Sequence, residues 1–511
     1  MAIYGYLWLF AAIFVAMFTT ATLIYWLQMV CYQAFGVNET SARLPSALAA
    51  LLTILVVYEL GRRMFGVGTG LLAGLVLVGS VGLLGAAHFA NPDALLVAFC
   101  TLTLALVWTD QQGARRGTLA WVGVACGLAV LAKGPIGALA PLGICLAYFA
   151  WQRQLSRLLD WRLGDVALAC FLVAAPWYIW VTVDTRGAWI KGFWNKHHAD
   201  RVTTAMENHS GPPYYYLLVL CVGLLPWSIF LGPTALHTWR RLRRPDAPDR
   251  PAVRFLVVWA GAFLVFFSLV RTKLPNYLLP AYPAFALLTA HMLERWRAGE
   301  WDVPRWMLRT SLACMALAGV GVGVGMLAGA GVLDVGAPAS RLYPDLAPWA
   351  WLGALFVVAA AVGWWMLERD RRAGVLATVA AAGVLFAALI AGGGILALEP
   401  YKATKSLAAA LPEGHQEREV RIAAYRFFQP SLVFYCRREV MRLDASAQAA
   451  EFLRGPYESY LFVPEGVWED ELRATAPDGV RVIESRPDLY SNRRVLLVGR
   501  PAANGEAVAG R

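Results

Sequence analysis

Residues 43–66 read RLPSALAALLTILVVYELGRRMFG. The run between Arg43 and Glu59 is almost wholly apolar, and the stretch closes on the pair Arg62 and Arg63. A helix needs roughly 20 apolar residues to cross the hydrocarbon of a bilayer, and arginines at its end mark the cytoplasmic side. This stretch is therefore predicted to span a membrane, and similar apolar runs recur along the chain.

The composition of the 511 residues agrees with a chain whose main solvent is lipid. Hydrophobic residues make up 59% and charged residues only 15%, with a mean hydropathy of +0.52; soluble domains carry about 25% charged residues. The net charge of +11 does not indicate nucleic acid, because Lys and Arg lie between apolar runs rather than on one basic face. We expect membrane lipids, and no nucleic acid, among the partners.

The apolar runs predict a polytopic α-helical membrane region over residues 1–398, with about thirteen transmembrane helices. The first 38 residues carry no charge, so they lack the basic start of a secretory signal peptide and are expected to be a retained membrane segment. The predicted spans are centred near residues 15, 52, 78, 101, 125, 143, 174, 224, 262, 285, 320, 357 and 386.

Basic residues are distributed unequally between alternate loops. One set of loops holds twenty arginines, and the opposite set holds nine Lys and Arg residues. Because cytoplasmic loops carry the excess, the first set is predicted to face the cytoplasm. An odd number of spans then places the C-terminal residues outside, in the periplasm if the host is Gram-negative, so the expected location is a bacterial inner membrane.

The sequence changes period after the last apolar run. Residues 399–511 are predicted to form a small α/β soluble domain, because short β-rich runs alternate with helical ones. The predicted strands lie at residues 420–428, 431–439, 458–466, 481–485 and 493–499, and the predicted helices at 447–455 and 468–476.

Two predicted outer loops place a charge at a helix break. In AHFANPDALL (87–96), Asp93 follows Asn-Pro at the start of a helix, where it can cap the helix or act as a catalytic base. In LAKGPIG (131–137), Lys133 precedes a Gly-Pro break, where an ammonium and released N–H groups suit a phosphate. Snorkelling of Lys133 to the interface is the alternative.

Two further outer segments collect ionisable groups. The loop from about 184 to 213 contains His197 and His198, which are candidate metal ligands or acid/base groups, and Arg201, which would share a helical face with His197. The segment VRTKLPNYLLPAYPAF (270–285) places Arg271, Lys273 and Tyr277 together. Cations beside a tyrosine suit a pyrophosphate or lipid phosphate.

These motifs occur in a familiar order from about residue 23 to 290, together with LLPW (224–227) and KLPNYLLPAYPAFALL (273–288). They resemble the C-type glycosyltransferases of the bacterial aminoarabinose lipid A transferase and protein O-mannosyltransferase group. The resemblance implies a membrane enzyme that transfers a sugar, with inversion, from a polyprenyl-phosphate carrier to a lipid A, other glycan or protein acceptor at the outer face.

The resemblance also implies roles for individual residues. Asp93 matches the acidic residue of the family's second outer loop and is the expected catalytic group. His197 matches a histidine that helps to hold a divalent metal. Lys133, Arg201, Lys273 and Tyr277 match positions that line the site for the carrier phosphate, and we add Arg271 to that set from its place beside them.

The start of the chain departs from the family pattern. Family members carry an Asp-Glu pair and a Phe-Glu-Lys-Pro-Pro stretch in the first outer loop, whereas LIYWLQ (23–28) is present here without any acidic residue before Glu39. We expect a truncated or frameshifted start; a non-catalytic relative, or a subfamily with its carboxylate elsewhere, are the alternatives. A glycolipid-binding protein and, less favoured, a lipid-linked sugar transporter are the competing functions.

Overall fold

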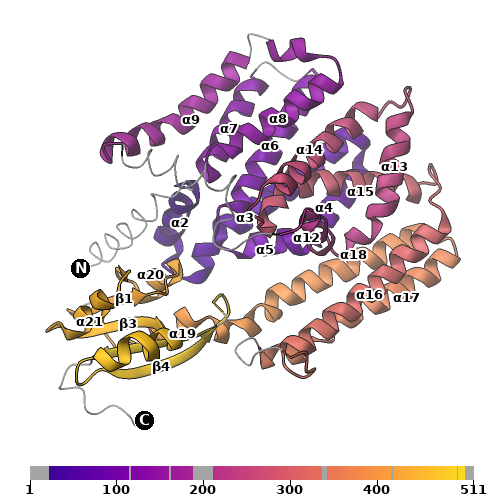
Figure 1. Ribbon diagram of the computed structural model, residues 1–511. Coiled ribbons are helices and arrows are strands. Elements are labelled where there is room, and N and C mark those ends of the chain that lie inside the picture. The colour runs from indigo at the N-terminus through magenta and orange to yellow at the C-terminus, as the bar shows by residue number, and fades with distance from the viewer. Residues whose placement is uncertain are drawn as a thin grey trace. The chain divides into compact units, whose positions relative to one another are not determined.

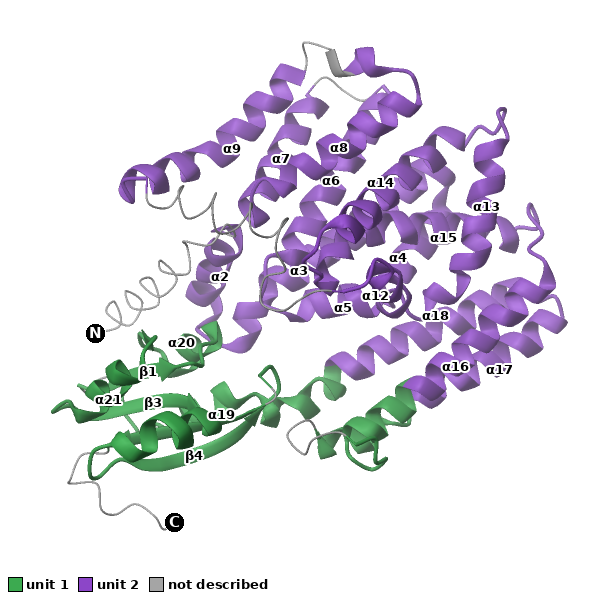
Figure 2. Cartoon of the chain, viewed as in Figure 1, with its two compact units in different colours: residues 1–16, 322–351, 392–511 green, residues 17–321, 352–391 purple. Residues whose placement is uncertain are grey.

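The computed structural model describes residues 22–113, 117–159, 163–187, 211–336, 342–415, 419–491 and 493–500. Figure 1 shows a long helical region and a smaller region with a sheet. Contacts divide the chain into two compact units, coloured in Figure 2: one contains residues 17–321 and 352–391, and the other contains residues 322–351 and 392–511. Each unit is described by itself.

The described residues up to 389 form helices and short connections. The helices are, in chain order, α2 (Thr22–Phe35), α3 (Glu39–Phe65), α4 (Val67–Val78), α5 (Val81–His88), α6 (Asp93–Gln111), α7 (Thr118–Lys133), α8 (Ile136–Trp151), η1 (Leu155–Leu159), α9 (Leu163–Asp184), α12 (Tyr215–Gly223), η4 (Trp227–Phe230), α13 (Leu231–Arg243), α14 (Arg250–Leu269), η5 (Pro275–Ala281), α15 (Tyr282–Arg297), α16 (Arg305–Gly329), η7 (Pro344–Trp349), α17 (Leu352–Glu368) and α18 (Arg372–Leu389).

The helices have the composition of membrane spans. Within the described ranges, seven helices are long and apolar enough to cross a bilayer, or up to nine if each of two bent pairs is one span. The predicted count of about thirteen is not confirmed. The runs centred near 125 and 143 form α7 and α8 of 16 residues each, which are shorter than the roughly 20 residues that a span needs.

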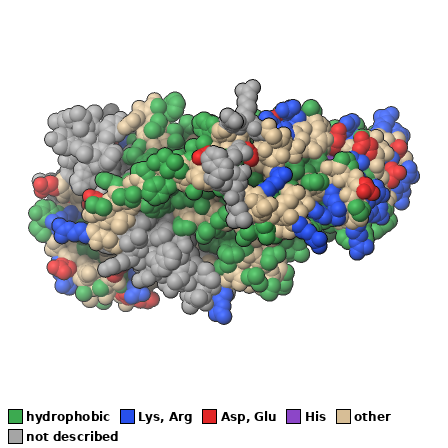
Figure 3. Space-filling model, turned by 90° about the horizontal axis from the view of Figure 1, so that it is seen from above, with side chains coloured by type: hydrophobic (Ala, Val, Ile, Leu, Met, Phe, Trp, Pro, Cys, Tyr) green, Lys and Arg blue, Asp and Glu red, His purple; other side chains and the backbone are tan. Residues whose placement is uncertain are grey.

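Exposed apolar side chains agree with a lipid environment. Leu168, Phe171 and Leu172 of α9 are all more than half exposed. Figure 3 shows hydrophobic side chains over much of one face, with Lys and Arg gathered toward one end. In water such a surface would favour aggregation, so the chain is a multi-pass membrane protein.

Two bent helix pairs meet on the ring of Tyr282. The chain turns by 61° between α4 and α5 and by 116° between α12 and the helices that follow it. A Cβ atom at Gly82 would lie 2.3 Å from Tyr282 Cε2, and one at Gly223 would lie 1.9 Å from its hydroxyl. Only glycine permits this approach. η5, which directly precedes Tyr282, contacts α5 and α6.

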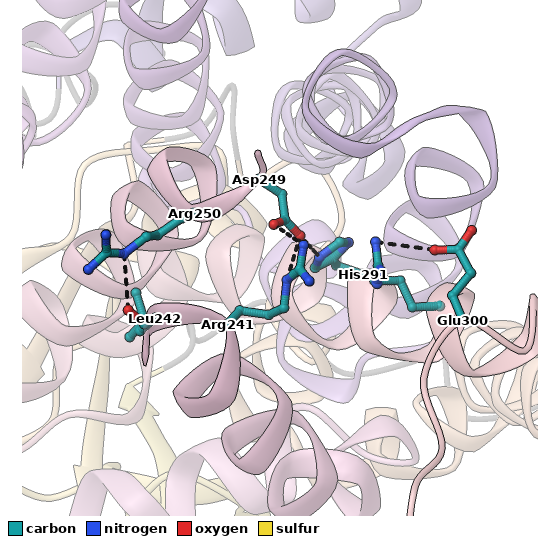
Figure 4. A network of polar contacts seen from close by, with 7 residues as sticks. Arg241, Leu242, Asp249, Arg250, His291 and Glu300 are labelled. Carbon is teal, nitrogen blue, oxygen red and sulfur yellow. Dashed lines mark hydrogen bonds and ion pairs between the residues drawn. The ribbon is translucent and has the colours of Figure 1, made fainter. Parts of the chain in front are cut away.

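A buried ionic network joins α13, α14 and α15, as Figure 4 shows. Asp249, at the start of α14, accepts hydrogen bonds from both Arg241 Nε (3.0 Å) and Arg241 Nη2, and His291 Nε2 lies 2.8 Å from its Oδ2. The Asp249 side chain is only 10% exposed. Burial opposes its ionisation, but the hydrogen bonds from His291 and Arg241 outweigh burial, so the pKa of Asp249 is lowered.

We expect Asp249→Asn to lower the stability of the full chain by about 3 kcal/mol, because it leaves Arg241 buried without a counter-charge. The measurement is the thermal unfolding midpoint in one detergent at neutral pH. This pH lies above the unfolded carboxyl pKa, where a group with a lowered folded pKa contributes fully. The control is Glu368→Gln, which breaks the half-exposed pair with Arg309 and should cost less than about 1 kcal/mol. Equal shifts for the two variants would contradict this account.

The second unit contains a five-stranded sheet in the order β2-β1-β3-β5-β4. β1 runs parallel to β2 and β3, whereas β5 runs antiparallel to β3 and β4. The elements from residue 390 onward are η8 (Ile390–Gly394), η9 (Leu396–Tyr401), α19 (Ala403–Ala409), β1 (Arg421–Tyr425), α20 (Pro430–Cys436), β2 (Met441–Leu443), α21 (Ser446–Arg454), β3 (Ser459–Pro464), α22 (Glu465–Val467), η10 (Trp468–Leu472), η11 (Arg473–Thr475), β4 (Arg481–Asp488) and β5 (Arg493–Arg500).

The small C-terminal α/β region is confirmed, with one wrong strand. The sequence predicts a strand over residues 431–439, but the segment forms α20, with Pro430 in its first turn. Leu432 and Cys436 lie one helical turn apart and both enter the core under the sheet. The short run LVFYC is apolar throughout and so carries no period that separates helix from strand.

Candidate active site

Asp93 begins α6 and is almost completely buried, with 4% of its surface exposed. Its carboxylate accepts a hydrogen bond from Lys133 Nζ on Oδ1 and one of 2.6 Å from Asn276 Nδ2 on Oδ2. Its backbone N–H donates to Asn91 Oδ1 at 3.2 Å. The carboxylate thus binds side chains of two other segments, while its place in the first turn of α6 also favours its negative charge.

Lys133 ends α7, which lies antiparallel beside α6, so the end of one helix meets the start of the other. Leu96 and Cys100 of α6 form a buried cluster with Ala129 of α7, which fixes this pairing. The lysine lies at the negative end of one helix dipole and the aspartate at the positive end of the other, so both charges are favoured. Gly134 follows with φ of 77°, a left-handed conformation that lets the chain turn at once into α8.

The 3-10 helix η5 brings a third segment to this point. Asn276 supplies the hydrogen bond to Asp93, and the ring of Tyr277 lies 5.5 Å from Lys133 Nζ, as a cation–π pair. Tyr277 also packs on Phe267, with ring centroids 5.0 Å apart. The structure thus joins three predicted outer segments, through Asp93, Lys133 and Tyr277.

Lys273 is buried, and its ammonium binds the end of α14 rather than Asp93. Its Nζ donates to the carbonyls of Phe267 (2.9 Å) and Ser268 (2.6 Å) at the end of α14, and lies 5.4 Å from the ring of Tyr216. Burial lowers the pKa of Lys273. Arg271 is exposed two residues earlier. The phosphate-binding roles of these two cations stay predictions.

His197 and Arg201 lie outside the described residues, and so do the other residues of the loop between 187 and 211. Across the ranges that the structure describes, no group of three His, Cys, Asp or Glu side chains is arranged to hold a metal ion. Both oxygens of Asp93 are already hydrogen-bonded. The divalent metal stays a prediction that rests on His197.

Asn276 was missed by the sequence analysis. Candidate residues at the membrane edge were identified by their charge, and an amide has none. In the same motif Lys273 and Tyr277 were selected instead. The useful signal would have been the place of Asn276 directly after Pro275, at the start of η5.

The arrangement has the chemistry of an anion site with one accessible cation. The Lys133 side chain is 22% exposed, against 5% for Asp93, so the ammonium is the part of the pair that a ligand can reach. An ammonium has three N–H donors, so its bond to Asp93 leaves capacity for phosphate oxygens. Tyr277 provides an aromatic wall beside it.

Comparison with known proteins identifies the fold of the chain. Residues 19–180 match the family described as dolichyl-phosphate-mannose-protein mannosyltransferase. The structure of ArnT from Cupriavidus metallidurans bound to undecaprenyl phosphate is similar, with a TM-score of 0.79, 23% identity and coverage of 95% of this chain and 88% of that one. The chain has the C-type glycosyltransferase fold. Asp93 and Lys133 lie inside the matched residues, and the resemblance predicted from the sequence is confirmed.

Two relatives in sequence match the chain over part of their length. An undecaprenyl phosphate-α-4-amino-4-deoxy-L-arabinose arabinosyl transferase from Pseudomonas aeruginosa is 35% identical over 303 residues, which are 58% of this chain and 54% of that protein. The protein of the same name from Erwinia tasmaniensis is 29% identical over 273 residues, 52% and 48% of the two chains. The chain thus matches about half the length of these relatives.

Proposed function

We propose that the chain transfers a sugar from a polyprenyl-phosphate carrier to an acceptor, as an inverting C-type glycosyltransferase. The single observation that carries the proposal is the convergence of Asp93, Lys133, Asn276 and Tyr277 in one cluster within this fold. The cluster offers an accessible ammonium to a phosphate and holds it against a buried carboxylate.

The reaction breaks the bond between the sugar's anomeric carbon and a carrier phosphate oxygen. The acceptor oxygen attacks that carbon from the opposite side, and the carrier phosphate leaves with the electron pair of the broken bond. An acceptor hydroxyl gives up its proton to a base as the new bond forms. The negative charge on the carrier phosphate increases as the bond breaks, so a fixed ammonium stabilises the transition state more than the ground state. In this proposal Lys133 supplies that charge and Asp93 keeps it oriented.

The proposed donor and acceptor classes follow the relatives. Their name specifies an undecaprenyl phosphate-linked aminoarabinose as the donor, and the similar solved structure holds undecaprenyl phosphate. We propose a donor of this kind, with a lipid A, other glycan or protein acceptor. The excess of arginine on one set of loops supports an inner-membrane orientation with the cluster, and the C-terminal sheet, on the periplasmic side.

The proposal is tested with membranes that carry the full chain. Undecaprenyl phosphate-aminoarabinose, radiolabelled in the sugar, is the donor, and lipid A is the first acceptor. We expect label to move from the carrier to the acceptor with time, and to stay on the carrier in membranes with Lys133→Ala. A wild-type chain that binds undecaprenyl phosphate but moves no label to any acceptor class would instead support the non-catalytic glycolipid-binding function.

A further inference from the structure

Asn276 makes the contact that completes the cluster. It lies 183 residues from Asp93 in sequence, and its Nδ2 donates to Asp93 Oδ2 at 2.6 Å. The other oxygen, Oδ1, accepts from Lys133. The two donors therefore hold the carboxylate from both sides, and they come from separate elements, η5 and α7.

We propose that Asn276 is a positioning residue, which holds Asp93 in the orientation that presents the Lys133 ammonium to the carrier phosphate. This inference rests on the proposed transferase function, because it assigns the ligand of that same site. Asn276 acts through Asp93 and Lys133 and does not itself contact the phosphate.

Loss of Asn276 would leave one oxygen of Asp93 without its donor. Asp93 is 4% exposed, so without Asn276 its Oδ2 would lose a donor in a place that water barely reaches. Without Asn276 the carboxylate is free to turn about its side-chain bonds, and Lys133, its ion-pair partner, would turn with it. The ammonium would then move away from the accessible side of the cluster.

The chemistry of an amide suits this task. A cationic side chain at position 276 would neutralise Asp93 and repel Lys133, and a carboxylate would compete for the ammonium. An amide donates a hydrogen bond without adding charge. Asn276 therefore holds Asp93 in place without adding a charge. Among the described residues of this cluster, the ion pair of Asp93 with Lys133 is then unchanged.

The same short helix positions the aromatic wall. Tyr277 directly follows Asn276, and its ring lies 5.5 Å from Lys133 Nζ. The far end of η5 is held independently, since Trp259 Nε1 donates to Pro280 O at 2.8 Å. Trp259→Phe thus removes a hydrogen bond to η5 without touching Asp93, which makes it a matched control.

The test measures binding of undecaprenyl phosphate to the purified full chain in detergent. We expect Asn276→Ala to raise the Kd about tenfold, the effect of losing one hydrogen bond to a charged group. Trp259→Phe should leave the Kd within about twofold of wild type, whatever it does to the thermal midpoint. A merely structural role for Asn276 would make the two variants behave alike.

A pH series provides the second readout. In Asn276→Asp two carboxylates face each other, so their repulsion keeps one of them protonated to a higher pH than an ordinary carboxyl group. At low pH the new group is protonated and can donate to Asp93, so we expect the Kd relative to wild type to be near one at about pH 5. The ratio should rise as pH increases to about 8, whereas a ratio that does not change with pH would contradict the proposal.

Transfer by the wild-type chain, measured in parallel, separates the two proposals. A wild type that binds undecaprenyl phosphate without transferring sugar overturns the proposed activity alone. If the Kd of Asn276→Ala equals that of wild type, the positioning role is overturned even if transfer is normal. A wild type that binds no undecaprenyl phosphate overturns both.

Discussion

Lys133→Ala is expected to lower kcat/KM for sugar transfer by about a thousandfold, the range found when a preorganised charge is removed from an active site. Lys133 is the accessible cation of the cluster, so its loss removes charge stabilisation from the leaving phosphate and leaves Asp93 buried without its counter-ion. The measurement is the initial rate of label transfer at several donor concentrations, with expression matched between variants.

Two variants control this result. Lys133→Arg retains the charge but changes its shape and should recover part of the activity, since a guanidinium also binds phosphate. Arg243→Ala removes an exposed cation from α13, within a loop region predicted to be cytoplasmic, and should leave the rate unchanged. Wild-type rates in Lys133→Ala would exclude this lysine from the site.

Asp93→Asn is expected to lower kcat/KM about a hundredfold, because the shape is kept but the charge that orients Lys133 is lost. The decisive comparison is the double variant with Lys133→Ala. If Asp93 acts only through Lys133, adding Asp93→Asn to Lys133→Ala causes no further loss, because the two effects are coupled.

If the loss of kcat/KM in the double variant is the product of the two single losses, Asp93 has a separate role, such as that of the catalytic base expected from the sequence. Thermal midpoints of all three variants must accompany the rates, because breaking a buried pair also destabilises a protein. A rate loss that tracks the midpoint, and recovers at lower temperature, would contradict a direct role in transfer.

Most of this cluster can be located from the sequence because its charges lie at helix breaks. Asp93 follows Asn-Pro and Lys133 precedes Gly-Pro, and these dipeptides alone place both residues at helix ends. Their direct pairing could not be predicted, because it depends on how α6 and α7 pack. Asn276 was missed for a related reason: its role comes only from a partner 183 residues away.

The span count could not be predicted reliably, for a physical reason. Gly82 and Gly223 let broken helices pack on Tyr282, and such breaks leave segments shorter than a full span. Hydropathy detects these segments but not how they pair or bend. The Asp249 network was equally hidden, because Arg241 and Asp249 read as ordinary loop charges until α13, α14 and α15 bring them together.

The most direct test of the central claim compares a polyprenyl phosphate with the matching polyprenol as ligands of the purified full chain. We predict that wild type prefers the phosphate by about a hundredfold or more, because the cluster holds a cation for an anionic ligand. Lys133→Ala should lose most of that preference while keeping its affinity for the polyprenol. A Lys133→Ala chain that still prefers the phosphate as strongly as wild type would contradict the claim that this cluster binds the carrier phosphate.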